Sequence, residues 1–215
     1  MQLEASTSHL SGQSAGEVAI LEAAVRLFSA SSYDAVSMRG VAEAAGVSKA
    51  NIYHHFSSKE SLYQAILQSS AAELSGLVDQ LAESPGSFAD RLANFAHAHL
   101  GHLENNALTS RVIIREAFSG NDERSKMLTD QVFGGIFQRI ISTFMAGQKA
   151  GELRPDLDPA LCATLLIGAD VFFFQASSLL QHVPQAGFVN RPLQFSNEMV
   201  DVMLNGMLVP SGVTT

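Results

Sequence analysis

The chain has 215 residues, of which 47% are hydrophobic and only 16% are charged. This length and composition exclude a disordered protein and predict a core that fills one or two domains. The formal charge of -8 argues against general attraction to nucleic acid. Residues 1–63 contribute little of that charge, because they hold four basic and six acidic residues, against nine and fifteen in the rest of the chain.

Three features bear on the compartment in which the protein works. The longest apolar stretch, 161–174, is interrupted by Asp170 and is shorter than the ~18 residues that suggest a membrane span. The single cysteine, Cys162, cannot form an internal disulfide and is expected as a small core residue. The first sixteen residues hold no Lys or Arg, unlike a signal peptide. We therefore expect a cytoplasmic protein with no membrane partner.

Apolar residues recur at helical spacing along the chain, and all six prolines come after position 84. The pattern predicts an all-α fold. Residues 1–13 are expected to form a disordered arm. Ser14 and Glu17 have the spacing of a capping box and predict the start of the first helix. Ser37 predicts the N-cap of a second, very short helix, which Gly46 ends in a left-handed conformation.

Two further serines predict the next helix starts. Ser48 is placed to cap a third helix that runs to about Phe56. Ser57 and Glu60 predict a capping box that opens a long fourth helix toward Leu81. These helices precede the break at 84–86.

After this break the apolar segments are longer, and they predict a second helical domain. Asp158 followed by Pro159 predicts one of its helix starts. We expect helices at about 87–104, 106–119, 122–149, 159–182 and 193–209. The expected domains are a helix-turn-helix domain at 14–58, a helical domain at 59–209 and a flexible tail at 210–215.

The segment 38–56 has the spacing of a helix-turn-helix. Ala42 allows the two helices to cross closely, and Gly46 allows the tight turn between them. The second helix would then project a face that carries hydrogen-bonding side chains for DNA bases or phosphates. These side chains are Ser48, Lys49, Asn51, Tyr53 and His54. An ordinary helical hairpin with a solvated polar face fits the same spacing, and spacing alone leaves both interpretations open.

Three stretches of this region carry a resemblance to a known family. They are YDAVSMRGVAEAAGVSK from Tyr33 to Lys49, IYHHF from Ile52 to Phe56, and SKESL from Ser58 to Leu62. The sequence closely resembles the TetR family of bacterial transcriptional regulators over roughly residues 17–66. It departs from the common family pattern at Ser32, and at Ala50 and Asn51 in the recognition helix.

The resemblance implies a DNA-binding role for named side chains. Ser37 and Lys59 would bind phosphate at helix N-termini. Tyr53 and His54 would reach the DNA backbone or a thymine methyl group. Base reading would fall to Lys49 toward guanine and Asn51 toward adenine, beside Ser48. The family further implies a homodimer on an inverted repeat of double-stranded operator DNA, a repressor as the default, and no cofactor.

In the family the last two long helices of each subunit form the dimer interface. Here the first of them, 159–182, is apolar on several faces and must be covered on several sides. The residues that the second would contribute are Phe195, Met199, Val202, Met203 and Met207. The alternative is that all these residues form core within one chain.

The second domain also predicts a pocket for a small, largely apolar effector. Phenylalanines recur at helical spacing near two arginines one turn apart. The candidate effector-binding residues are His99, Arg111, Arg115, Phe118, Phe137 and Phe172. An ordinary core that contains these residues fits the same pattern.

The sequence gives no support for catalysis. It lacks the common nucleophile, dinucleotide, phosphate-loop and zinc-protease motifs, so we expect neither an enzyme nor a cofactor. His97, His99 and His102 are close together, but nearby residues do not complete a metal shell and we expect no metal site. The competing function is a helical small-molecule-binding protein or enzyme whose helix-turn-helix no longer engages DNA.

Overall fold

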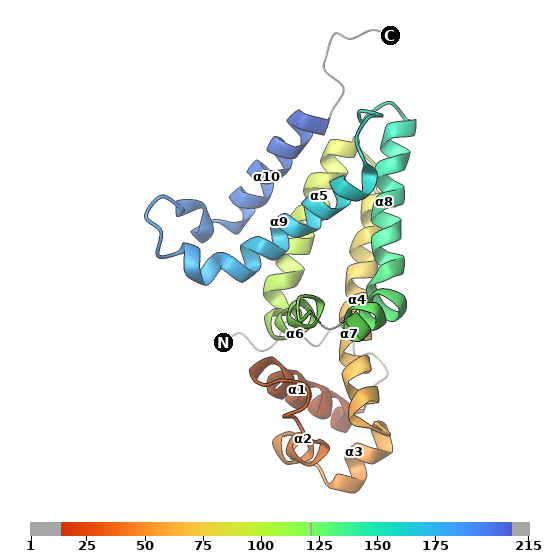
Figure 1. Cartoon of the computed structure of the whole chain (residues 1–215), viewed down its shortest axis with the longest axis vertical. Coiled ribbons are helices and arrows are strands. Elements are labelled where there is room, and N and C mark those ends of the chain that lie inside the picture. The colour runs from red at the N-terminus through yellow and green to blue at the C-terminus, as the bar shows by residue number, and fades with distance from the viewer. Residues whose placement is uncertain (1–13, 121, 208–215) are drawn as a thin grey trace. The chain divides into compact units, whose positions relative to one another are not determined.

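The computed structural model describes residues 14–120 and 122–207, and these residues form helices and no β-strand (Figure 1). The predicted all-α fold is confirmed. The expected arm at 1–13 and tail at 210–215 lie outside the described residues. In chain order the helices are α1 (Ala15–Ala30), α2 (Met38–Ala45), α3 (Lys49–His55), α4 (Lys59–Glu83), α5 (Phe88–Asn105), α6 (Ala107–Ala117), α7 (Asp122–Leu128), the π-helical turn η1 (Thr129–Phe133), α8 (Gly134–Lys149), α9 (Pro159–Leu180), the 3₁₀ turn η2 (Gly187–Asn190) and α10 (Pro192–Met207).

The described chain forms two compact units that are not contiguous in sequence. Unit 1 holds residues 14–72 and, apart from 121, residues 105–128. Unit 2 holds residues 73–104 and 129–207. Helix α4 contributes to both, and α6 and α7 belong with the helix-turn-helix in unit 1.

Four of the five predicted helix caps are formed, at Ser14, Ser37, Ser48 and Asp158. The Ser14 hydroxyl accepts a hydrogen bond from the Glu17 backbone N–H at 3.2 Å. The Asp158 carboxylate accepts from the Ala160 N–H at 2.8 Å, with Pro159 at the first helical position. Each such cap contributes about 1 kcal/mol to its helix.

The predicted capping box at the start of α4 is wrong by one residue. Ser58 and Ser61 form it instead, because each backbone N–H donates to the other residue's hydroxyl at 3.0 Å. The carboxylate of Glu60 is engaged elsewhere and accepts from the Tyr33 hydroxyl at 2.7 Å.

The core of unit 1 is built on the inner faces of α1 to α4. Phe28, Ile52 and Leu62 are fully buried there. Tyr63 packs its ring edge against Phe28 with centroids 5.0 Å apart. Burial of side chains of this size contributes about 1.5–3 kcal/mol each.

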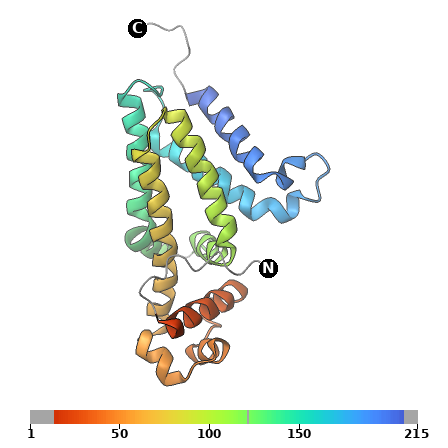
Figure 2. The same ribbon diagram turned by 180° about the vertical axis from the view of Figure 1, so that it is seen from behind.

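Unit 2 is a helical bundle in which α4 lies between α5 and α8 (Figures 1 and 2). Arg139 of α8 binds Asp79 of α4, and its other nitrogen donates to the Ser75 hydroxyl at 2.6 Å. On the other side of α4, His102 of α5 lies 3.1 Å from the Glu73 carboxylate. These polar contacts join α4 to both neighbouring helices.

The segment predicted as one helix at 122–149 contains a π-helical turn, η1, where the chain passes from unit 1 to unit 2. A Cβ atom on Gly134 would collide with the Thr129 backbone carbonyl, five residues earlier. The turn therefore depends on glycine at this position. Turns of this kind are rare and often lie at functional places.

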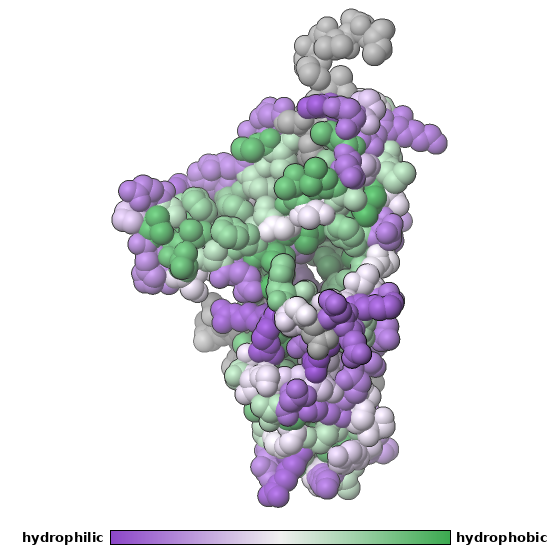
Figure 3. Space-filling view, in the orientation of Figure 1, coloured by the Kyte–Doolittle hydropathy of each residue, from purple (hydrophilic) through white to green (hydrophobic). Residues whose placement is uncertain are grey.

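Helix α9 has two chemically different faces. Its buried face carries Leu166, Asp170 and Phe173. The opposite stripe is apolar, and its members are each more than half exposed: Leu161, Leu165, Phe172 and Leu179. Figure 3 shows apolar side chains gathered over α9 and α10. By length and composition α9 is long and apolar enough to cross a membrane, with a mean hydropathy of 1.6 in an 18-residue window. The expectation drawn from 161–174 considered a shorter stretch than the whole helix.

Candidate DNA-binding surface

The turn between α2 and α3 has the geometry that the sequence predicts. Gly46 adopts φ 68°, in the left-handed region, and closes α2. The next N–H, that of Val47, donates to the Ala42 carbonyl at 3.0 Å. Val41 and Ile52 are buried on the two helices, which fixes how they cross. Helix α3 is therefore held rigidly against the rest of the unit.

The exposed face of α3 presents a continuous row of side chains. Lys49, Tyr53 and His54 are all exposed, as expected, and Tyr53 keeps 45% of its surface. Ser48 caps the helix by accepting from the Asn51 N–H at 3.1 Å. The row offers an ammonium group, a phenol and an imidazole, which are suitable partners for bases and phosphates.

Asn51 lies beside this row rather than within it. A Cβ built on Gly16 of α1 would be 3.7 Å from the Asn51 amide oxygen and 3.8 Å from Nε2 of His55. His55 also lies 4.0 Å from the Glu17 carboxylate. The side chains of Asn51 and His55 thus flank the first turn of α1. The role of Asn51 as a base reader remains a prediction.

Lys59 is more constrained than a free phosphate-binding lysine. Its ammonium group donates to the carbonyls of Tyr33 and Val36, at 3.0 and 3.1 Å. It also lies 4.3 Å from the centre of the Tyr33 ring. Lys59 therefore holds the loop that leads to Ser37 and α2. One of its three N–H donors remains for a phosphate.

A second cation binds the same tyrosine. The guanidinium of Arg124, from α7, lies 4.2 Å from the Tyr33 ring centre and bonds the Glu116 carboxylate at 3.0 Å. Burial and the hydrogen bond to Glu60 raise the pKa of Tyr33 to about 12, so its hydroxyl stays protonated. The loop before α2 is thereby tied to α4 and α7.

Sequence reasoning missed two residues of this surface. Ala50 is exposed between Lys49 and Tyr53, and its methyl group can meet a thymine methyl. Arg39, in the first turn of α2, is exposed and bound to Glu43 at 2.8 Å. The helical period of α3 pointed to Ala50, whereas Arg39 is recognised only from its position near the Ser37 cap.

The candidate effector residues are divided between the two compact units. His99, Phe137 and Phe172 belong to unit 2, whereas Arg111, Arg115 and Phe118 belong to unit 1. Arg115 donates to the Phe28 carbonyl at 2.5 Å and so binds the C-terminal end of α1. Phe118 is 77% exposed, Phe172 lies on the exposed stripe of α9, and Arg111 is exposed.

Of the candidates, His99 is the one that is fully buried with a polar partner. Its Nδ1 lies 2.8 Å from the Asp170 carboxylate, and Phe137 of α8 is half-buried. In the described part of the chain, no three His, Cys, Asp or Glu side chains are grouped so as to hold a metal ion. His99 and His102 each face a carboxylate of another helix.

Comparison with known proteins agrees with this surface. The family described as "Bacterial regulatory proteins, tetR family" matches residues 20–66. The HTH-type transcriptional repressor KstR2 of Rhodococcus jostii is 35% identical over 163 residues, which cover 73% of this chain and 76% of the relative. The nucleoid occlusion factor SlmA of a Marinomonas species is 22% identical, over 88% of this chain and 93% of its own.

A solved structure extends the likeness to the whole fold. The SmeT–triclosan complex matches with a TM-score of 0.71 at 18% identity, covering 94% of this chain and 95% of SmeT. The capped helix-turn-helix, its match to the family over α1 to α4, and the 35% identity to KstR2 along most of both chains lead to one conclusion. This chain belongs to the TetR family of bacterial transcriptional regulators.

Proposed function

We propose that this protein is a homodimeric repressor that binds an inverted-repeat operator and is released by a small, largely apolar effector. The observation that supports it most is the rigid, capped α3 with an exposed row at Lys49, Tyr53 and His54. The relative KstR2 is an HTH-type transcriptional repressor, which supports repression here. As a cytoplasmic regulator, the protein would meet its operator and its effector in the same compartment.

The dimer is supported by the exposed stripe of α9. Leu161, Leu165, Phe172 and Leu179 follow one line along the helix, on the side away from Asp170. On α10, Leu193 and Val202 are exposed and apolar, and Phe195, Met199 and Met203 are half-buried. The side chain of Met207 lies outside the described residues. A second copy that covered this face would remove a large apolar surface from water.

The low positive charge of the proposed DNA-binding surface also favours a dimer. The exposed side of α2 and α3 carries few cations, mainly Lys49 and Arg39, and the chain as a whole is acidic. Each phosphate contact adds only a limited electrostatic contribution to binding. Two subunits that bind two half-sites together therefore bind the operator more tightly than one subunit does. An inverted repeat with half-sites about one helical turn apart fits such a dimer.

The effector is assigned to unit 2. The SmeT structure was determined with triclosan, an apolar aromatic molecule, which supports the same class of ligand here. His99 and Phe137 are the candidates that the proposal keeps for direct contact. Arg115 is bound to α1, so its effect on effector response would be indirect.

The experiment is selection of bound duplexes from a random pool by the full chain, followed by fluorescence anisotropy on the enriched sequence. We expect an inverted repeat, with affinity lost in Tyr53→Ala and Lys49→Ala. Arg26→Ala is the matched control, since it removes an exposed cation of α1 outside the α3 row. Enrichment of no sequence, or equal losses in all three variants, would overturn the assignment of α3.

A further inference from the structure

The Tyr33 ring, in the loop before α2, is contacted by two cations from different parts of the chain. Nζ of Lys59, from α4, lies 4.3 Å from the ring centre, and the guanidinium carbon of Arg124, from α7, lies 4.2 Å from it. Both distances are within the range of about 6 Å in which the face of an aromatic ring attracts a cation. The Arg124 side chain is only 27% exposed, and its partial removal from water strengthens this attraction.

Arg124 has an ionic partner that keeps it at this position. Its Nη1 donates to Oε2 of Glu116 at 3.0 Å, and the Glu116 side chain is 8% exposed. Burial and the neighbouring Glu116 carboxylate raise the pKa of Tyr63. The rings of Tyr63 and Tyr33 in turn meet edge to face, with centroids 5.0 Å apart. Glu116, Arg124 and the two tyrosines therefore form one contiguous cluster.

The loop that this cluster holds leads directly into α2. Val36 of the loop is buried, and its carbonyl accepts from the Lys59 ammonium group. The Ser37 hydroxyl accepts from the Gly40 N–H at 3.0 Å and caps α2. Because a single tight turn joins α2 to α3, a displacement of the loop would move both helices.

The two cations come from the two separate stretches of sequence that form unit 1. Lys59 lies in the first stretch, together with the helix-turn-helix, and Arg124 lies in the second. Unit 2 resumes shortly after Arg124, at Thr129. The loop before α2 thus depends on a side chain that α7 supplies from outside the helix-turn-helix segment.

We propose that Arg124 is a positioning residue for operator binding: its guanidinium, placed over the Tyr33 ring, holds α2 and α3 in the arrangement that fits the operator and does not touch DNA itself. This inference rests on the proposed function and adds a residue to it. The apparent dissociation constant is the intrinsic one divided by the fraction of subunits in that arrangement. Because both subunits of a dimer must have it, a loss of about threefold in each gives about a tenfold loss of affinity.

The test must separate the contact on Tyr33 from the ion pair with Glu116. Removal of Arg124 alone would leave a buried carboxylate without this cation, which lowers stability whatever the function of the pair. Glu116→Gln is therefore the background. The glutamine keeps an oxygen that accepts from the Arg124 guanidinium, so this single variant should bind the operator as wild type does.

The decisive protein is the double variant Glu116→Gln/Arg124→Met, which keeps an unbranched side chain at 124 without its charge. We expect it to lose about tenfold in operator affinity relative to Glu116→Gln, with an unfolding temperature close to that of the single variant. Arg124→Lys in the same background restores a cation for the Tyr33 ring and should recover most of the affinity.

Two measurements on the full-length chain distinguish positioning from a direct or a merely structural role. Fluorescence anisotropy on the enriched operator over a salt series should give the same salt slope for the double variant and Glu116→Gln, because no phosphate contact is lost. Amide hydrogen exchange without DNA should be faster at 33–41 in the double variant and unchanged in α1.

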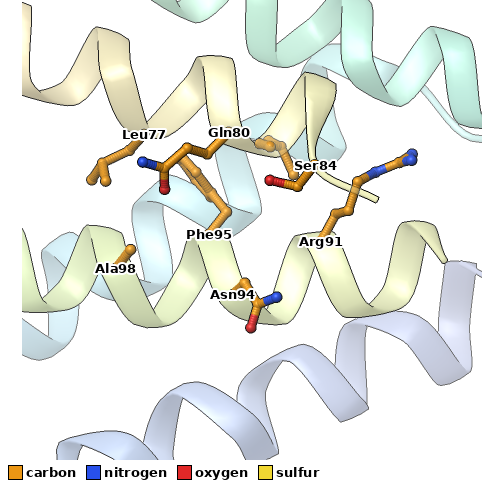
Figure 4. A pocket seen from close by; sticks show the side chains of 8 residues that line it. Leu77, Gln80, Ser84, Arg91, Asn94, Phe95 and Ala98 are labelled. Atoms are coloured by element: carbon orange, nitrogen blue, oxygen red, sulfur yellow. The ribbon is translucent and has the colours of Figure 1, made fainter. Parts of the chain in front are cut away.

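Two further variants are controls. Lys126→Met removes the other cation of α7, which is exposed, and so measures the effect of lost charge alone. Asn94→Ala changes an exposed polar side chain of unit 2, in the lining of a groove of about 240 Å³ between α4 and α5 (Figure 4). Neither should change operator affinity or the exchange at 33–41.

The positioning role is overturned if the double variant binds the operator as Glu116→Gln does, or if Lys126→Met loses as much affinity. A salt slope that falls by about one unit per subunit would show a direct phosphate contact instead. Faster exchange throughout α1, or no recovery with Arg124→Lys, would reduce Arg124 to a structural residue. Each of these results rejects this inference alone, whereas a wild-type chain that binds no operator would reject the proposed function and this inference with it.

Discussion

Lys49 and Lys59 are both lysines at a helix N-terminus, but they have different surroundings. Lys49 is exposed at the start of α3, and Lys59 donates to two loop carbonyls. We predict that Lys49→Ala lowers the salt dependence of operator binding by about one unit without changing stability. Lys59→Ala should instead lower the free energy of unfolding by about 1–3 kcal/mol, since charged hydrogen bonds are lost.

Anisotropy over a salt series and urea unfolding check this pair of variants. The Lys59 assignment fails if Lys59→Ala unfolds at the wild-type urea concentration while its salt dependence falls. A lysine that served phosphate alone would give that result.

Asp170 gives the protein a distinct dependence on pH. Burial raises the pKa of this carboxyl above its ordinary value of 3.8, and the hydrogen bond from His99 opposes that rise in part. The folded chain therefore favours the protonated form more than the unfolded chain does. The cost of ionising Asp170 is absent at acidic pH and grows as pH rises from about 4 through the folded-state pKa.

We predict that the stability of wild type relative to Asp170→Asn falls as pH rises through this window. Urea unfolding of both proteins at a series of pH values measures the difference, in which titrations common to both cancel. A difference that grows in favour of wild type with rising pH would contradict the raised pKa.

Arg115 connects two helices of unit 1 that are far apart in sequence. It donates to the Phe28 carbonyl at the end of α1, where unpaired carbonyls give a helix its negative end. We predict that Arg115→Ala lowers the free energy of unfolding of unit 1 by about 1–3 kcal/mol. Arg111→Ala, one turn earlier on α6 and exposed, should have little effect. Equal effects in urea unfolding would contradict the capping role.

The π-helical turn predicts opposite effects for two adjacent glycines. Gly134→Ala places a methyl group against the Thr129 carbonyl and must open the turn, with a loss of about 1–3 kcal/mol. Gly135→Ala has open space around its Cβ and should gain about 0.5–1 kcal/mol, because alanine favours the helix. Unfolding of the two variants measures the contrast, and two losses of similar size would argue against a π turn.

Local signals predicted the helices well and failed where a distant contact decides the structure. Ser14, Ser37 and Asp158 act within three residues, so their caps followed from the sequence. The error at Ser57 arose because Ser57 and Glu60 match the common capping-box pattern, whereas the pair that forms, Ser58 and Ser61, has serine in place of its Glu or Gln. The π turn at 129–133 depends on the absence of one Cβ atom, which hydrophobic spacing does not register.

The candidate sites also divide into those set by local sequence and those set by distant contacts. The exposed row of α3 depends on helical period alone, and the sequence predicted its members except Ala50. His99 and Asp170 are 71 residues apart, and Arg115 is 87 residues from Phe28. No spacing rule links such positions, so the sequence predicted His99 without its partner and assigned Arg115 to an effector without its contact to α1.

At the scale of the whole molecule, the proposed dimer depends on the exposed stripe of α9. We predict that Leu165→Lys yields a species near the 22.9 kDa of one chain in sedimentation, where wild type shows twice that mass. Two like charges at the centre of an apolar contact oppose association. Operator affinity should fall at least about tenfold, because one subunit keeps only one half-site.

Leu108→Lys is the matched control for the assembly. It places the same charge at an exposed leucine of α6, outside the stripe. Wild-type mass in both variants would exclude α9 as the interface. Loss of the dimer in both would show that added charge, and not the position on α9, is responsible.

The division of unit 1 into two stretches of sequence has a consequence for recombination. Residues 105–128 supply the guanidinium groups that complete α1 and the Tyr33 loop, although some thirty residues of the other unit come before them. In a chimera, the first seventy residues of this chain would be joined to the remainder of a relative. The transferred helix-turn-helix would then lack Arg115 and Arg124. Transfer of operator specificity should therefore require that α6 and α7 are exchanged together with the helix-turn-helix. The alternative is a recipient that already carries arginine at both positions.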